Sequence, residues 1–191
     1  MSAPNPFLIN VLALRRQPGS TRAEHRSGPL PDLRVSGSAV PPGALVEVDA
    51  VLEGVHNGIV VTADVAAPWA GECRRCLRPV TGVVHSHVRE LYEEHSDGEE
   101  TYPLRGDQID LAPLARDAVL LELPQAPLCL EDCLGLCPEC GANRNEGDCG
   151  HVISIIDPRW VALDALREDT TESERDDDGR PQEEDLEGQE P

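Results

Sequence analysis

The sequence contains no lysine, one methionine and few aromatic residues, and it lacks any long apolar run. Aromatic residues make up 3% of the 191 residues, so the core must be built from Val, Leu, Ala and Ile. Such a core buries less area per side chain, and added crosslinks would help to stabilise it. No stretch reaches the roughly 18 apolar residues that a membrane helix needs. The first residues also lack the basic and apolar regions of a signal peptide, so we expect a cytoplasmic protein with no membrane partner.

Charge is distributed unevenly along the chain. All 16 basic residues are arginine, and the formal net charge is -20. Residues 168–191 carry 12 acidic residues against two arginines and are almost devoid of apolar residues, so we predict a disordered acidic tail. An acidic chain is a poor non-specific ligand of nucleic acid, because neutralising phosphates requires a cationic surface. Any contact with RNA would be local or would go through a protein partner.

Alternating apolar residues predict three antiparallel strands in the first half of the chain. Ala44–Glu53 and Ile59–Ala67 alternate on either side of Asn57-Gly58, a typical hairpin turn, and Val80–Tyr92 alternates again. A short apolar run at Phe7–Leu14 predicts a further strand. Residues 15–34 are rich in Pro, Gly, Ser and Arg, which predicts a long, mobile, mildly basic loop.

The second half of the chain predicts one main helix. Residues 93–108 are acidic and predict a loop, whereas Leu111–Leu123 has an apolar stripe at helical spacing, with Asp110 as the N-cap. A second, short helix is predicted at Arg159–Arg167. The expected fold class is therefore α+β, with a small antiparallel β-sheet, one main packed helix and a Cys-rich C-terminal segment.

The seven cysteines are the strongest chemical signal in the chain. Five of them lie in residues 129–151, and Cys137-Pro-Glu-Cys140-Gly141 has the shape of a metal-binding knuckle. The other two form Cys73-Arg-Arg-Cys76, about 50 residues upstream. In a reducing compartment such cysteines are more often metal ligands than disulfides. Together with His151 they make eight ligands, which divide into two sets of four.

Local order along the chain favours one partition into two zinc sites. One site would contain Cys137, Cys140, Cys149 and His151, and the other Cys73, Cys76, Cys129 and Cys133. The second of these would stabilise the fold more, because it joins segments more than 50 residues apart. Two alternatives stay open: Cys73 and Cys76 could pair with Cys137 and Cys140, or the chain could hold one zinc ion rather than two.

Other chemistry is less well supported by the sequence. A thioredoxin-like redox role for Cys73-Arg-Arg-Cys76 would fit the flanking arginines, which favour thiolate. The surroundings, however, predict a β-hairpin rather than a βαβ unit, and a redox motif does not need five further cysteines. The sequence contains none of the phosphate-binding, zinc-protease or nucleophile-elbow motifs, so we expect a protein that is not an enzyme and has no small-molecule substrate.

These features, taken in order, resemble the YceD-like family of large ribosomal RNA subunit accumulation proteins. The resemblance rests on several motifs spread over the chain between about Phe7 and Leu166: Phe7-Leu-Ile-Asn-Val, Glu72-Cys73-Arg74-Arg75-Cys76-Leu77, the helix ending in Leu123-Pro124, Pro127-Leu128-Cys129, Cys133-Leu-Gly-Leu-Cys137-Pro-Glu-Cys140-Gly141 and Asp157-Pro158-Arg159-Trp160. It implies a single domain over residues 1–167, with the loop at 15–34 and the zinc-binding segment at 129–151, followed by the tail at 168–191.

The resemblance also implies a function in ribosome assembly. It implies a cytoplasmic protein that supports synthesis, processing or stability of 23S rRNA, with large-subunit assembly intermediates as partners, directly or through another protein. If RNA is touched directly, the candidates are Arg74, Arg75 and Arg78 in or beside the Cys73–Cys76 motif and Arg144 in the loop between Cys140 and Cys149. The alternatives are a zinc-ribbon adaptor that binds only protein and a thiol-based redox sensor.

Overall fold

The computed structural model describes residues 5–96 and 100–151 of the chain. The chain divides into two compact units, residues 1–149 and residues 150–191, and all the described helices and strands belong to the first. Among the described residues, no helix is long and apolar enough to cross a membrane. The predicted helix at Arg159–Arg167, the domain boundary at residue 167 and the acidic tail lie outside the described residues.

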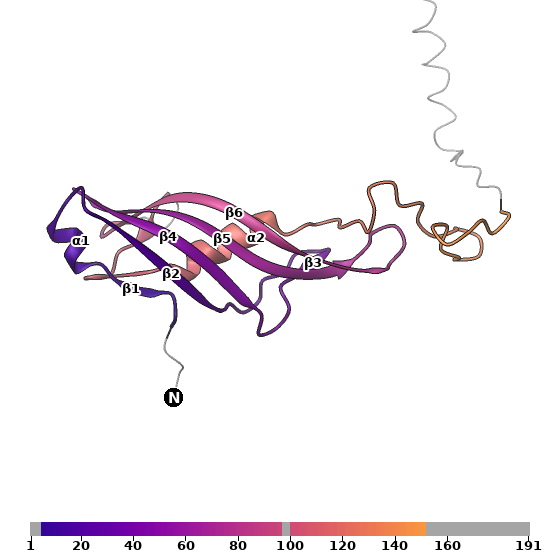
Figure 1. Cartoon of the computed structure of the whole chain (residues 1–191), viewed down its shortest axis with the longest axis horizontal. Coiled ribbons are helices and arrows are strands. Elements are labelled where there is room, and N and C mark those ends of the chain that lie inside the picture. Colours follow the sequence, from indigo (N-terminus) through magenta and orange to yellow (C-terminus); the bar gives the residue numbers. More distant parts are fainter. Residues whose placement is uncertain (1–4, 97–99, 152–191) are drawn as a thin grey trace, which may run out of the picture. The chain divides into compact units, whose positions relative to one another are not determined.

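A twisted six-stranded sheet dominates the first unit (Figure 1). Its strands pair in the order β2-β4-β5-β6-β7, with the short strand β3 also paired to β5; all pairs are antiparallel except β6 with β7. The strands are β2 (Thr21–Pro29), β3 (Ser38–Ala39), β4 (Leu45–Val55), β5 (Gly58–Glu72), β6 (Pro79–Glu93) and β7 (Tyr102–Pro103).

The three strands predicted from alternation are confirmed. They correspond to β4, β5 and β6, with Ala44 just outside β4, and His56 and Asn57 form the turn between the first two, where Val55 pairs with Gly58. The β5–β6 hairpin is longer than the pattern predicted, since all 15 residues of each strand are paired, as far as Glu72 with Pro79. This hairpin carries the first knuckle at its tip.

The predicted loop at residues 15–34 is wrong for its central part, where β2 pairs with β4 over all nine of its residues. Apolar alternation did not predict this strand, because its inner face carries charged side chains in place of apolar ones. Arg22, Glu24 and Arg26 lie opposite Leu52, Ala50 and Val48. The Glu24 carboxylate lies 2.8 Å from a guanidinium nitrogen of each arginine, which makes a half-buried charged row compatible with the strand.

The apolar run at residues 7–14 also differs from its prediction. Only Leu8–Asn10 forms a strand, β1, which pairs with β8 (Gln108–Asp110) in a separate two-stranded sheet. The chain then turns into the short helix α1 (Leu12–Arg16). Phe7, Ile9, Val11 and Leu14 are all buried, so the run contributes to the core although it does not continue as a strand.

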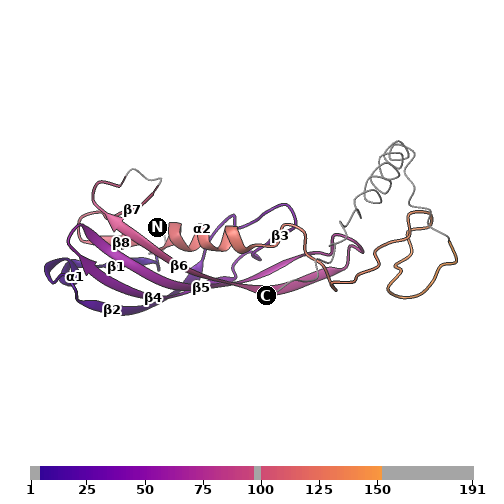
Figure 2. The same ribbon diagram turned by 90° about the horizontal axis from the view of Figure 1, so that it is seen from above.

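The core lies between the inner face of the sheet and a second layer. That layer contains α2 (Ala112–Glu122), which packs on β5 and β6, together with α1 and the β1–β8 pair (Figure 2). The helix predicted at residues 111–123 is thus present, and the Asp110 carboxylate accepts a hydrogen bond from the Ala112 N–H at 2.9 Å. The described part of the chain is sheet-rich with two helices, and its cysteine groups lie toward the C-terminal side.

Candidate metal centre

The first knuckle is the loop that closes the β5–β6 hairpin, residues 73–78. The Cys73 N–H donates to the Arg78 carbonyl at 2.8 Å, and the Leu77 N–H donates to the Cys73 carbonyl at 2.9 Å. Leu77 has a φ of 60°, a conformation that few residues other than glycine adopt. This backbone folds tightly enough to bring the Cys73 and Cys76 side chains together.

The second knuckle, residues 137–142, has the same backbone pattern. The Cys137 N–H donates to the Ala142 carbonyl, and the Gly141 N–H donates to the Cys137 carbonyl, both at 2.8 Å. Gly141, with a φ of 73°, occupies the position of Leu77. Two loops with different sequences therefore form the same backbone turn, and each brings two cysteines close together.

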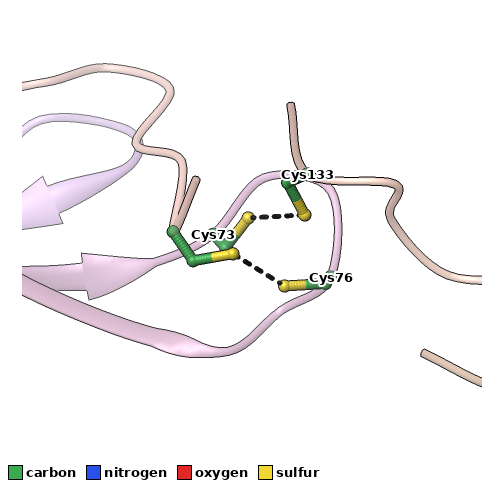
Figure 3. Close-up of side chains that lie close together, drawn as sticks. Cys73, Cys76 and Cys133 are labelled. Carbon is green, nitrogen blue, oxygen red and sulfur yellow. Dashed lines mark hydrogen bonds between the residues drawn. The ribbon is translucent and has the colours of Figure 1, made fainter. Parts of the chain in front are cut away.

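The first cysteine group consists of Cys73, Cys76, Cys129 and Cys133, and its four sulfurs lie within 4.8 Å of one another. The Cys73 and Cys133 sulfurs are 3.8 Å apart, and those of Cys76 and Cys129 are 3.5 Å apart (Figure 3). A tetrahedral ion with metal–sulfur bonds of about 2.3 Å separates its ligands by about 3.8 Å. These distances far exceed the ~2.05 Å of a disulfide bond, and all seven cysteines are free thiols.

Three of the four cysteines in the first cysteine group are buried, and Cys129 is half-buried. Cys73, Cys133 and Cys76 are 0%, 3% and 6% exposed, and together with Val80 and Leu136 they form a hydrophobic cluster separate from the main core. Because the ligands come from the hairpin tip and from the segment after α2, a bound ion would crosslink parts of the chain more than 50 residues apart.

Hydrogen bonds hold the two contributing segments together. The Arg74 N–H donates to the Pro127 carbonyl at 2.9 Å, and the Leu136 N–H donates to the Arg75 carbonyl at 3.1 Å. The Asn145 amide lies 3.3 Å from the Cys133 sulfur and can donate to a thiolate there. Sequence reasoning missed Asn145, because only the fold brings it, twelve residues away along the chain, to this sulfur.

The surroundings of the sulfurs change their acidity. Burial opposes ionisation of Cys73, but backbone hydrogen bonds at Cys129, Cys76 and Arg75 outweigh it and lower the pKa of Cys73 to about 6. The hydrogen bond to the Cys76 sulfur and burial raise the pKa of Cys129 to about 12. Donors that stabilise a thiolate before metal binds are typical of structural metal sites.

The second cysteine group consists of Cys137, Cys140, Cys149 and His151, whose ligand atoms also lie within 4.8 Å of one another. Cys137 is buried, Cys140 and His151 are exposed, and Cys149 is intermediate. Backbone hydrogen bonding at Cys140 lowers the pKa of Cys137 to about 7 despite its burial. The structure thus gathers all eight candidate ligands in the two sets that local order along the chain favours, and each set could hold a metal ion.

The four arginines proposed for RNA contact are engaged to different degrees. Arg75 donates to the Cys133 carbonyl at 2.9 Å, Arg78 forms an ion pair with Glu146 at 3.0 Å, and Arg144 donates weakly to the Leu134 carbonyl at 3.5 Å. No hydrogen bond or ion pair joins the exposed Arg74 guanidinium to any described residue. Arg74 is therefore the one of these four that is left available to a partner.

A polar row on the outer face of the sheet was also missed by sequence reasoning. His25, Asp49, Asp64 and His87 lie directly opposite one another across β2, β4, β5 and β6. Each histidine Nδ1 lies 2.7 Å from its neighbouring carboxylate. Since the two histidines stand on strands separated by two others, the row does not converge on a single centre.

Fold and site together define a sheet-rich protein with two cysteine groups, each able to hold a metal ion. The chain belongs to the family described as large ribosomal RNA subunit accumulation protein YceD, whose model matches residues 61–167. The match begins in β5 and contains every candidate metal ligand, and it confirms the resemblance found from the motifs.

Curated relatives of the chain occur in mycobacteria. The chain is 38% identical over 167 residues to an uncharacterized protein of Mycobacterium tuberculosis and equally to one of Mycobacterium bovis; both matches cover 83% of this chain and 80% of the relative. An uncharacterized protein of Mycobacterium leprae is 32% identical over 189 residues, with 92% and 85% covered. No solved structure gives a significant match to the chain.

Proposed function

We propose that this protein is a non-enzymatic, cytoplasmic factor that supports the accumulation of 23S rRNA and thereby assembly of the large ribosomal subunit. Membership of the YceD family, over a match that contains both cysteine groups, is the observation that carries this proposal. The proposal includes an α+β domain whose C-terminal part is crosslinked by zinc ions bound at the two knuckles.

Zinc is the metal proposed for both groups. Thiolates are soft ligands that suit zinc, and sulfurs 3.5–3.8 Å apart match the edge of a zinc–thiolate tetrahedron. In the first cysteine group four protein ligands would fill the coordination sphere and leave no position for a substrate. This supports a structural ion and a protein that acts by binding, without a chemical step of its own.

The nature of the partner depends on the arginines. Arg75 and Arg78 already make intramolecular contacts, with the Cys133 carbonyl and with Glu146. These contacts favour a second candidate, an adaptor that reaches the rRNA through a protein partner. Direct RNA contact would fall mainly to Arg74. The net charge of -20 also opposes a broad contact with phosphates.

Metal analysis tests the zinc part of this proposal. Protein purified under reducing conditions should contain two zinc ions per chain by mass spectrometry of the metal, and Cys137→Ser should reduce this to one and lower the melting temperature. An unchanged zinc content in Cys137→Ser would show that this residue is not a ligand.

Depletion of the protein in its own cells tests the ribosomal part. We expect the ratio of 23S to 16S rRNA to fall and to recover with the wild-type gene but not with Cys73→Ser. Binding of the full-length protein to 23S rRNA fragments at two salt concentrations separates the candidates, since direct phosphate contacts weaken with salt. An unchanged rRNA ratio after depletion would contradict the function itself.

A further inference from the structure

The outer edge of β6 is open over most of its length. Beyond the pairing of Tyr92 and Glu93 with β7, β6 pairs only with β5. In residues 5–96 and 100–151, no backbone hydrogen bond joins residues 80–90 to any segment other than β5, and no described strand runs along this edge (Figures 1 and 2). The edge therefore presents a long row of unpaired backbone donors and acceptors.

The opposite edge of the same sheet is protected, whereas this one is not. On β2 the inner face carries Arg22, Glu24 and Arg26, and inward-pointing charges of this kind discourage a second strand from pairing. On β6, residues 80–88 contain four valines and a threonine, with no Asp, Glu, Lys, Arg or Pro, and the charged residues Arg89 and Glu90 stand only at the end of the open edge. A long, weakly charged edge rich in β-branched residues is the kind that accepts another strand.

We propose that the open edge of β6 pairs antiparallel with the β6 edge of a second copy of this chain, forming a two-fold symmetric dimer with one continuous sheet. A two-fold axis at Val84 places Val83 opposite His85 and Val80 opposite Val88 of the other copy. It places Glu90 opposite Arg78. Arg78 lies just before β6 and is ion-paired with Glu146 of its own chain, so Glu90 of the other copy would add a second carboxylate beside its guanidinium. The histidines do not face one another.

The faces of the two sheets match in this register. Exposed residues of β6 are the odd-numbered ones between 79 and 89 and the more buried ones are even-numbered, and an axis at an even-numbered residue pairs odd with odd. Each copy would thus keep its α2 layer on the same side of the joined sheet. Because each chain carries a net charge of -20, long-range repulsion opposes dimerisation, and association should strengthen as salt screens it within a Debye length of about 10 Å at 0.1 M.

Sedimentation velocity of the full-length, metal-loaded protein tests the proposal. We expect a concentration-dependent species of twice the 20.7 kDa chain mass, favoured by higher salt. Val83→Lys should weaken dimerisation about tenfold, because each dimer would gain two lysines on the paired edge, and edge lysines discourage strand pairing. The matched control is Val51→Lys: Val51 is 49% exposed, Val83 is 55% exposed, and Val51 lies on the central strand β4, so the control should dimerise like the wild type.

Hydrogen exchange locates the interface independently of these variants. As the protein is concentrated, the amides of residues 80–91 should exchange more slowly, while those of residues 21–28 remain unchanged. A wild-type protein that stays monomeric at every concentration would overturn the proposal and leave the edge to a strand of another protein. Equal weakening by Val83→Lys and Val51→Lys, or protection confined to β2, would overturn it as well.

Discussion

The two knuckles have the same backbone hydrogen bonds but differ in their burial and in the strands around them. In both, the N–H of the first cysteine donates to a carbonyl five residues on, and the N–H four residues on donates back to the carbonyl of that cysteine. The first knuckle closes a hairpin of two 15-residue strands, and its leading cysteine is fully buried. The second lies outside any strand, with Cys140 exposed. A short sequence thus builds the same turn in both places, and we expect the contribution of each turn to stability to depend on the distant segments packed around it.

Removing one cysteine from each group should give the largest difference in stability between the two knuckles. Cys73→Ser should lose one metal ion and reduce the free energy of unfolding by at least about 4 kcal/mol, because the site joins the hairpin to the segment after α2. Cys140→Ser should also lose one metal ion but affect the melting of the sheet far less. Metal content and thermal unfolding followed by circular dichroism check both, and equal melting temperatures would contradict the difference.

Metal affinity should rise with pH in the neutral range. Without metal, Cys129 keeps its proton at pH 7 because its pKa is raised to about 12, so binding must displace a proton there. Each displaced proton weakens binding about tenfold, or ~1.4 kcal/mol, per unit decrease in pH. Cys73, with a pKa of about 6, adds to this competition only as the pH falls below about 6. Competition with a chromophoric chelator between pH 6 and 8 measures the slope, and a flat profile would refute it.

Arg74 and Arg75, which are neighbours in the first knuckle, should contribute differently to the stability of the protein. Arg75→Ala removes the donor to the Cys133 carbonyl, and a lost hydrogen bond from a charged group costs about 1.5–3 kcal/mol, less where it is partly exposed. Arg74→Ala should change stability by less than about 0.5 kcal/mol. Chemical denaturation of both variants measures this, and a stability loss in Arg74→Ala as large as in Arg75→Ala would contradict it.

Exchanging leucine and glycine between the two knuckles, at the position with positive φ, should change stability least. Leu77 is 59% exposed at a φ of 60°, so Leu77→Gly should stabilise the protein by about 1 kcal/mol by relieving the steric cost of this conformation. Gly141→Leu should destabilise the second knuckle by a similar ~1 kcal/mol, because the space around Gly141 is open and only the backbone conformation opposes a side chain. Shifts of the same sign in the two variants would rule out this explanation.

Much of the fold could be predicted from short-range patterns. The alternation at residues 44–53, 59–67 and 80–92 predicted three strands, because each buries one face on the core. β2 could not be predicted in this way, since its inner face carries Arg22, Glu24 and Arg26, and Glu24 pairs with both arginines only in the folded strand. The apolar run at residues 7–14 predicted burial correctly but not the change from β1 to α1.

The features of the candidate metal centre also divide into those that local sequence predicts and those that need the fold. The spacing of Cys137 and Cys140, with Gly141 behind them, predicts a knuckle whatever the surroundings. By contrast, the contact of Asn145 with the Cys133 sulfur and the intramolecular bond of Arg75 depend on segments that meet only in the folded chain. The same holds for the row from His25 to His87, which requires four strands in register.

By itself, the sequence determined the candidate ligands, the two knuckle turns and the family of this protein, because these depend on residues close together in the chain. Only the tertiary structure decided which cysteines share a centre, which arginines remain available and which sheet edge stays open. Those properties depend on distances between segments tens of residues apart, and such distances exist only once the strands have paired and the hairpin tip has met the chain beyond α2.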